Sequence, residues 1–332
     1  MRALGLLLLC VLAPARAQRS NSPLFVFVHV VKTGGTALEK WLARVHGDDA
    51  RCSLRPKDTR DPDYAGYWRR HRGELLARCA VVTGEFDVSF VEVVRASTNR
   101  TIIPLTVLRH PAERVASWYA MRLRQFRGRV PCVDAPASNG GALARVLDVL
   151  TDARSQTVCA SETSLRCCLR ESNVPRKCMQ GGVCGAGRNL MTMVLAGSDD
   201  AGAVPFHGDL CRTAASKKRT RIALQLDDGA ELLARAIENA ERFAHVGVSS
   251  NLSATQCAYL ALLESSGAAL SRTKMKTLRA QSCEGDAVRH EGANYERDLG
   301  PALWGRLLAY NRLDLALFEW ARRRRPVVRL LA

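Results

Sequence analysis

The sequence lacks, at its amino terminus, an apolar run long enough for a comfortable membrane span. The run there covers only residues 4–13, whereas a membrane helix needs about 20 apolar residues. Arg2 precedes the run and Ala15-Arg16-Ala17 follows it, a pattern typical of a signal peptide over residues 1–17. A short uncleaved anchor is the alternative, and either segment would direct the chain into the secretory lumen.

Acidic residues are also scarce. The 332 residues include 32 Asp and Glu against 49 Lys and Arg, so the formal net charge is +17. Removal of residues 1–17 takes away two arginines and leaves +15 (17 minus 2). Surface solvation accounts for part of this charge, but a lumenal protein this basic is suited to an anion such as a nucleotide or an acidic polysaccharide. The compartment argues against nucleic acid.

No internal repeat and no low-complexity composition is present. Hydrophobic residues make up 47% of the chain and charged residues 24%, which excludes disordered and fibrous classes. A chain of this length can bury a sizeable core, either as one large α/β domain with insertions or as two small domains.

Cysteine is abundant and unevenly placed. Cys10 would leave with the signal, and seven of the remaining eleven cysteines lie within residues 132–211. This spacing predicts a loop-rich insert stapled by disulfides, with one cysteine left over and the pairing open. A zinc site is the alternative, but no Cys-x2-Cys pair recurs with histidines at ligand spacing, so we expect no metal. The sequons at Asn99 and Asn251 agree with a lumenal location.

Apolar runs alternate with helical patterns along the chain, while residues 50–75 are polar and irregular. This alternation predicts a parallel α/β sheet flanked by helices, in a single domain over residues 22–325. We expect strands over 24–29, 80–83, 102–108 and 245–248, and helices over 37–45, from 111 onward, and over 188–196, 230–243, 253–264 and 302–321.

The strongest chemical signal is Lys32-Thr33-Gly34-Gly35-Thr36, between a buried strand and a helix. Two glycines let the backbone approach an anion, and the first helical turn directs N–H groups and a favourable dipole at it. The order differs from the nucleotide triphosphatase loop, where lysine follows the glycines. A strand-to-helix turn that needs glycine for its geometry alone is the alternative.

Arg109 and Ser117 form the second signal. Arg109 ends the strand over 102–108, and Pro111 opens the next helix, so Ser117 lies about two turns into that helix. A guanidinium and a hydroxyl that converge at this edge of the sheet are suited to a second phosphate group.

These motifs resemble those of a known family. His29-Val30-Val31-Lys32-Thr33-Gly34-Gly35-Thr36 resembles the 5'-phosphosulfate loop of Golgi carbohydrate sulfotransferases, especially the heparan sulfate 2-O and 6-O group. The segment from Thr106 to Tyr119 (TVLRHPAERVASWY) is similar to the family's 3'-phosphate segment. The likeness continues more weakly through Asn189-Leu190-Met191-Thr192 and the last helices.

The resemblance implies a P-loop-like parallel sheet and a sulfotransferase of the Golgi lumen. Its co-substrate would be 3'-phosphoadenosine 5'-phosphosulfate (PAPS), and its acceptor a hydroxyl of an acidic poly- or oligosaccharide. Lys32 would stabilise charge on the leaving phosphate. The implied binding residues for the 5'-phosphosulfate are Lys32, Thr33, Gly34, Gly35, Thr36 and Ala37, and those for the 3'-phosphate are Arg109 and Ser117.

The chain departs from the family at the catalytic base. The related enzymes use histidine after the second strand, where this chain has Thr83-Gly84-Glu85-Phe86. We expect Glu85 to accept the proton, with a structural glutamate, His29 and His110 as alternatives. This departure leaves open a catalytically impaired glycan-binding protein, and a phosphotransferase is a third possibility. Two arginine groups would line the acceptor cleft: Arg122, Arg124, Arg127 and Arg129, and Arg44, Arg51 and Arg55.

Overall fold

A computed structural model describes residues 22–54, 64–125, 143–144, 147–148, 151, 189–197, 229–268, 270–284 and 294–324. The predicted signal segment over residues 1–17 lies outside these ranges. So does the predicted cysteine-rich insert over residues 132–211, apart from the short described stretches within it. The expectations for both segments therefore remain predictions.

Five parallel strands form one sheet with the order β2-β3-β1-β4-β5. Apolar runs made four of these strands predictable, because strands buried on both faces need continuous hydrophobic residues. The structure thus confirms the α/β class with a parallel sheet flanked by helices. The strands are β1 (Leu24–Val28), β2 (Arg51–Ser53), β3 (Val81–Gly84), β4 (Ile102–Leu108) and β5 (His245–Val248).

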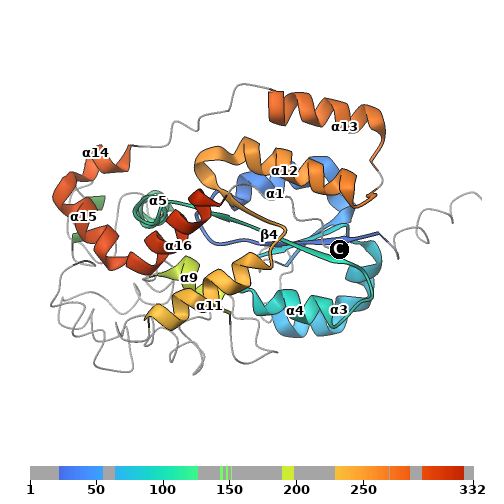
Figure 1. Cartoon of the computed structure of the whole chain (residues 1–332), viewed down its shortest axis with the longest axis horizontal. Helices are drawn as coiled ribbons and strands as arrows, with labels where there is room; N and C mark the ends of the chain where they lie inside the picture. Colours follow the sequence, from blue (N-terminus) through green and yellow to red (C-terminus); the bar gives the residue numbers. More distant parts are fainter. Residues whose placement is uncertain are drawn as a thin grey trace, which may run out of the picture.

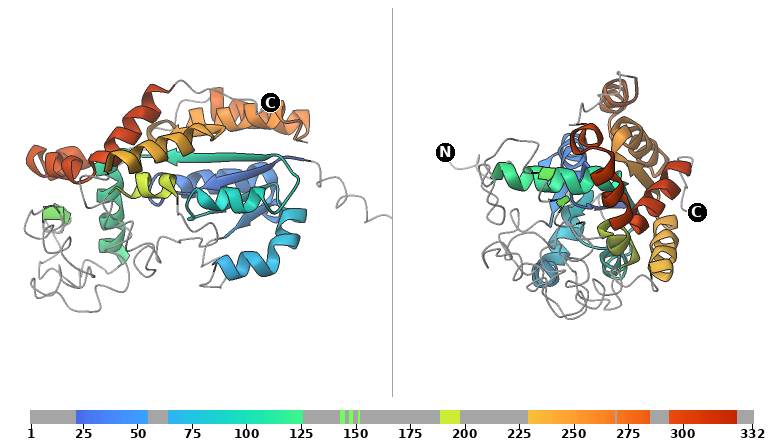
Figure 2. Two further views of the ribbon diagram at one scale, coloured as in Figure 1. Left: turned by 60° about the horizontal axis from the view of Figure 1, so that its bottom comes forward. Right: turned by 90° about the vertical axis from the view of Figure 1, so that its left-hand side faces the viewer.

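Helices cover both faces of the sheet (Figures 1 and 2). One face packs against α1 (Gly35–His46), α12 (Leu252–Ser265) and α13 (Arg272–Arg279), which continues as a π-helical turn, η6 (Ala280–Glu284). The opposite face packs against α3 (Tyr64–Arg78), α4 (Ser89–Arg95), α9 (Leu190–Ala196), α11 (Gly229–Glu241) and α16 (Arg312–Arg323).

A third group of helices gathers beyond the carboxyl end of β4. This group comprises α5 (Pro111–Gln125), α14 (Tyr295–Leu299) and α15 (Pro301–Tyr310), which share an apolar cluster with Val31 of the loop after β1. The short 3-10 turns η2 (Asp48–Ala50) and η5 (Ser249–Asn251) precede β2 and α12. No helix within the described ranges combines the length and apolarity needed to cross a bilayer.

Two sequence expectations were wrong. Residues 50–75 are not irregular throughout, since β2 and most of α3 lie there, and Trp68 and Leu75 bury one side of α3. The expected helix over 302–321 is divided into α15 and α16 at Asn311, whose buried side chain bonds the Leu307 carbonyl. Asn311 Oδ1 also accepts the N–H of Asn189, a distant partner that local helix propensity does not reveal.

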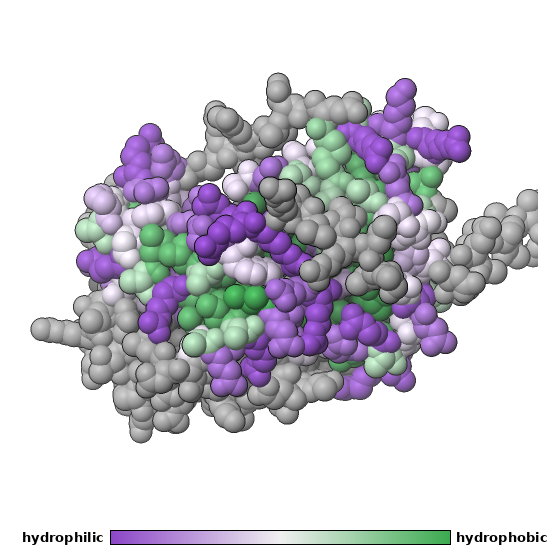
Figure 3. Space-filling model, viewed as in Figure 1, coloured by the Kyte–Doolittle hydropathy of each residue, from purple (hydrophilic) through white to green (hydrophobic). Residues whose placement is uncertain are grey.

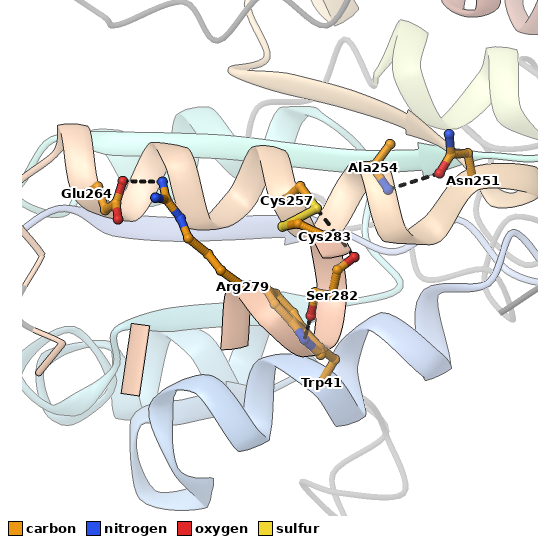
Figure 4. The surroundings of a disulfide bond; sticks show 8 residues. All are labelled: Trp41, Asn251, Ala254, Cys257, Glu264, Arg279, Ser282 and Cys283. Carbon is orange, nitrogen blue, oxygen red and sulfur yellow. Dashed lines mark hydrogen bonds and ion pairs between the residues drawn. A yellow bond between two sulfur atoms is a disulfide. The ribbon is translucent and has the colours of Figure 1, made fainter. Parts of the chain in front are cut away.

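Among the described residues two disulfides are present, one on each side of the sheet. Cys52–Cys79 links β2 to the residue after α3, and Cys257–Cys283 links α12 to η6. Beside the second disulfide, Trp41 of α1 donates from Nε1 to Ser282 Oγ at 3.0 Å (Figure 4). Both bonds are compatible with a secretory or extracellular location, because disulfides persist in oxidising compartments.

The strand order predicts a ligand crevice between β1 and β4. The chain leaves β1 through α1 toward β2 at one edge of the sheet, whereas it leaves β4 toward β5 at the other edge. Adjacent parallel strands whose connections diverge in this way leave room for a ligand at their carboxyl ends. The two predicted anion-binding motifs begin at these two strand ends.

Candidate anion-binding site

The loop between β1 and α1 folds back on itself through Thr33. The Thr33 hydroxyl donates to the Val30 carbonyl at 2.8 Å, and the side chain is fully buried. Gly34 has φ 94° and Lys32 has φ 67°, so both residues lie in the left-handed region of the backbone. Glycine adopts this conformation without strain, which accounts for its use at position 34. The motif therefore forms a tight turn that requires glycine at position 34.

The first turn of α1 presents backbone donors at the end of this loop. The Ala37 N–H already donates to the Gly34 carbonyl at 3.0 Å. The N–H groups of Gly35 and Thr36 come earlier in the helix, where no preceding turn supplies carbonyl acceptors. Two donors and the positive end of the helix dipole therefore lie where a bound anion would be stabilised.

Gly35 is required by its neighbour His29. A Cβ built on Gly35 would lie 2.7 Å from His29 Cγ and closer still to two other ring atoms. The imidazole is only 3% exposed, stacks on Phe27 and shares a hydrogen bond of 3.1 Å between Nδ1 and Glu39 Oε1. The His29 ring thus packs against the loop at Gly35, and its buried pairing with Glu39 argues against a role as the catalytic base.

Arg109 joins the second motif to the first. Its Nη1 donates to the Lys32 carbonyl at 3.4 Å, and its Nε pairs with Glu113 Oε2 at 3.0 Å. The Arg109 side chain is 19% exposed and that of Glu113 is 44% exposed, so the guanidinium is partly accessible from solvent. Residues 77 positions apart in sequence are therefore in direct contact, as the two-motif hypothesis requires.

Further contacts hold α5 against the loop. Lys32 Nζ lies 3.7 Å from Met121 Sδ, and Val31 shares an apolar cluster with Val115 and Ala116 of α5. Ser117, the next residue on this helix, is 8% exposed. The structure thus packs the helix that carries Ser117 against the loop that carries Lys32.

Glu85 lies on the other side of the loop from Arg109. It directly follows Gly84, whose carbonyl accepts the His29 N–H at 2.9 Å, and β3 pairs with β1 up to this point. The Glu85 side chain is partly exposed. Glu85 therefore follows β3 on one side of β1, while Arg109 follows β4 on the other side.

His110 faces the terminal helices. Its ring stacks on Trp304 with a centroid distance of 5.2 Å and meets Phe318 edge-on. Burial lowers the pKa of His110 below its ordinary value, although Glu113 opposes this effect. The histidine next to Arg109 therefore packs into the α15–α16 layer, which argues against a role as the base.

A buried polar network that the sequence did not reveal fixes the far side of α5. Arg114 and Asp314 form an ion pair at 3.7 Å, and both side chains are 0% exposed. The Asp314 carboxylate also accepts hydrogen bonds from the backbone N–H of Met191 and from the backbone N–H and the hydroxyl of Thr192. Burial raises the pKa of Asp314 and lowers that of Arg114, and their mutual attraction opposes both shifts.

Asn189 completes the network. Its side-chain oxygen accepts the N–H groups of Leu313 and Asp314 at the start of α16, while Asp314 caps the start of α9. The two helices therefore cap each other, and Arg114 ties α5 to both. The only sequence signal was the weak family likeness through residues 189–192, which carried no physical interpretation.

The arginines expected to line an acceptor cleft are mostly untested. Arg44 is exposed on α1 and Arg51 is partly buried on β2, away from the crevice in sequence and in sheet order. The side chains of Arg55, Arg122, Arg124, Arg127 and Arg129 lie outside the described part of the chain. The cleft wall remains a prediction.

Comparisons with known proteins do not extend these findings. No protein-family model matches the chain, and a search of curated proteins found no match.

Proposed function

We propose that this chain is a PAPS-dependent carbohydrate O-sulfotransferase. The observation that carries the proposal is the contact between Arg109 and the Lys32 carbonyl. This contact joins two motifs that are 77 positions apart in sequence at the carboxyl ends of β1 and β4. A loop of the Lys-Thr-Gly-Gly-Thr type suits a phosphosulfate, and a second cation at the same crevice suits a further phosphate on the same nucleotide. The P-loop-like character of the sheet is part of this proposal.

The reaction would be an in-line displacement at sulfur. An acceptor hydroxyl oxygen forms a bond to sulfur while the bond from sulfur to the 5'-phosphate oxygen breaks, and adenosine 3',5'-bisphosphate leaves. The N–H groups of Gly35 and Thr36, together with Lys32, would stabilise the charge that collects on the departing phosphate. Arg109 and Ser117 would hold the 3'-phosphate, which distinguishes PAPS from ATP.

The hydroxyl proton needs a base on the acceptor side. Glu85 follows β3, on the side of the loop opposite Arg109, so an acceptor that approaches over β3 would meet the carboxylate without displacing the nucleotide. The carboxylate would take the proton as the new sulfur–oxygen bond forms. This arrangement assigns the donor to the β1–β4 crevice and the acceptor to the β3 side.

A transfer assay tests the proposal. Purified full chain is incubated with PAPS carrying labelled sulfate and with a panel of acidic and neutral glycans, and label on the glycan is measured. Lys32→Gln keeps the long side chain but removes the charge, and should reduce transfer at least about 100-fold. Arg95→Ala, which removes an exposed cation elsewhere, should leave transfer unchanged. Substantial transfer by the Lys32→Gln variant would refute the role of Lys32.

The glycan-binding alternative is separated by nucleotide binding. Adenosine 3',5'-bisphosphate at 100 times its Kd should stabilise a sulfotransferase by about 2.7 kcal/mol. A protein that binds glycans only should show no shift in Tm. Glu85→Gln should retain the bisphosphate shift while transfer falls roughly 100-fold or more, because it removes proton acceptance and not donor binding.

A further inference from the structure

The outer surface of α13 carries a concentration of unpaired cations. Arg272, Lys274 and Lys276 are exposed, while Met275 and Leu278 bury the opposite side against α1 and α12. No acidic residue occurs within the helix, and within the described ranges none of the three cations forms an ion pair. Figure 3 shows hydrophilic side chains gathered over α13 at the upper right.

Several exposed arginines elsewhere on the surface are paired with carboxylates. In the described part of the chain, one exposed arginine on each of α4, α11, α14 and α16 pairs with a carboxylate from the same helix. These pairs are Arg95–Glu92, Arg242–Glu238, Arg297–Asp298 and Arg322–Glu319. On α13 itself Arg279 pairs with Glu264 of α12, whereas Arg272, Lys274 and Lys276 lie in no ion pair among the described residues.

The neighbouring helix α1 carries two further exposed cations. Lys40 and Arg44 are exposed on α1 and likewise lie in no ion pair among the described residues. They follow Thr36 at spacings of four and eight residues, which is about one and two helical turns. Next to Lys40, Trp41 donates to Ser282 just beyond α13, so the two helices are tied together (Figure 4).

We propose that the α13 surface (Arg272, Lys274 and Lys276), extended by Lys40 and Arg44, is a binding site for an acidic polysaccharide. Its exposed residues are arginine, lysine and threonine only, and its apolar residues are buried. A helix that inserts into a lipid surface needs an exposed apolar face, which α13 does not have. A soluble polyanion fits this surface better than a membrane does.

The choice of a carbohydrate partner rests on the proposed sulfotransferase function. A chain of sugars bound along α13 and α1 would be retained close to the loop at the start of α1. The surface would then hold a long acceptor near the reaction site between transfers, through contacts that do not involve the donor.

A matched pair of variants tests the site. The first combines Arg272→Ala, Lys274→Ala and Lys276→Ala. The control combines Arg95→Ala, Arg242→Ala and Arg297→Ala, so each variant loses three positive charges. Binding to immobilised heparin, a sulfated polysaccharide, is measured without nucleotide at several NaCl concentrations. Each exposed cation contributes only a little to polyanion binding and the effect is screened by salt, so loss of all three should make the α13 variant bind about tenfold more weakly, with a shallower salt dependence, and the control less than about twofold.

Each other outcome overturns the site. Equal losses in both variants would show that heparin responds only to net charge, and unchanged binding by the α13 variant would show that the surface is unused. Binding of the wild-type chain to phosphatidylserine vesicles that exceeds heparin binding and depends on α13 would assign the surface to membranes. Stabilisation by adenosine 3',5'-bisphosphate is measured in parallel: its absence in the wild type would refute the donor site alone.

Discussion

Gly35→Ala offers a direct test of how the anion-binding loop is built. Gly35 is the first residue of α1, and its φ lies outside the left-handed region, so alanine can adopt the backbone conformation there. The obstacle is the His29 ring, which occupies the position of the new methyl group. The ring cannot easily move, because it is buried, stacked on Phe27 and bonded to Glu39.

The expected magnitude follows from this geometry. Insertion of a methyl group into a packed site costs about 1–3 kcal/mol. When His29→Ala removes the ring, the same Gly35→Ala change should become neutral or stabilising by up to about 1 kcal/mol, since alanine favours a helix over glycine. The double-mutant cycle should therefore show a coupling energy of about 2 kcal/mol between the two positions.

Urea denaturation of the wild type, the two single variants and the double variant supplies the four free energies of unfolding. Gly34→Ala is the control, because its φ of 94° strains alanine whether or not His29 is present. If Gly35→Ala costs the same in both backgrounds, then the His29 ring is not what requires glycine, and the packing argument fails.

Three further predictions concern stability. Burial, with a smaller contribution from Arg324, lowers the pKa of His245 to about 4 from 6.5, so the unfolded chain binds more protons between these pH values. The free energy of unfolding is therefore complete above pH 6.5 and should be about 2 kcal/mol lower at pH 5. Urea titrations across this pH range measure the loss, which His245→Gln should remove. Arg114→Met leaves Asp314 as a buried charge and should cost about 3–5 kcal/mol of unfolding free energy, whereas a cost below 1 kcal/mol would show that the ion pair contributes little. Arg100 donates to four backbone carbonyls, which no lysine can reach together, so Arg100→Lys should lower Tm by several degrees and an unchanged Tm would contradict this role.

Sequence predicted the elements whose signals are local. β1 and β4 are continuous apolar runs, and the expected bounds agree with the structure within a residue. β2 was missed because it contains only three residues, two of them polar, and gains its place by pairing with β3. α3 was missed because four arginines obscure the spacing of its buried Trp68 and Leu75.

Non-local partners account for the rest. The break between α15 and α16 depends on a hydrogen bond between Asn311 and Asn189, which are 122 positions apart. Arg114 was expected only as part of a motif, since nothing near it in sequence indicates that its partner is Asp314. For the candidate site, sequence predicted which residues follow β1 and β4, but the contact between Arg109 and the Lys32 carbonyl depends on how those strands pair.

The position of Arg109 is set twice, once by the sheet and once by α5. Pairing of β1 with β4 brings the two strand ends into register, and the Thr106 hydroxyl donates to the Val28 carbonyl at 2.9 Å at that point. Arg114, one turn along α5 from His110, fixes the helix against α9 and α16. Because Arg109 lies between these two fixed points in sequence, the proposed function predicts that loosening the Arg114 anchor weakens binding of a 3'-phosphate more than binding at the loop, which β1 and α1 hold independently.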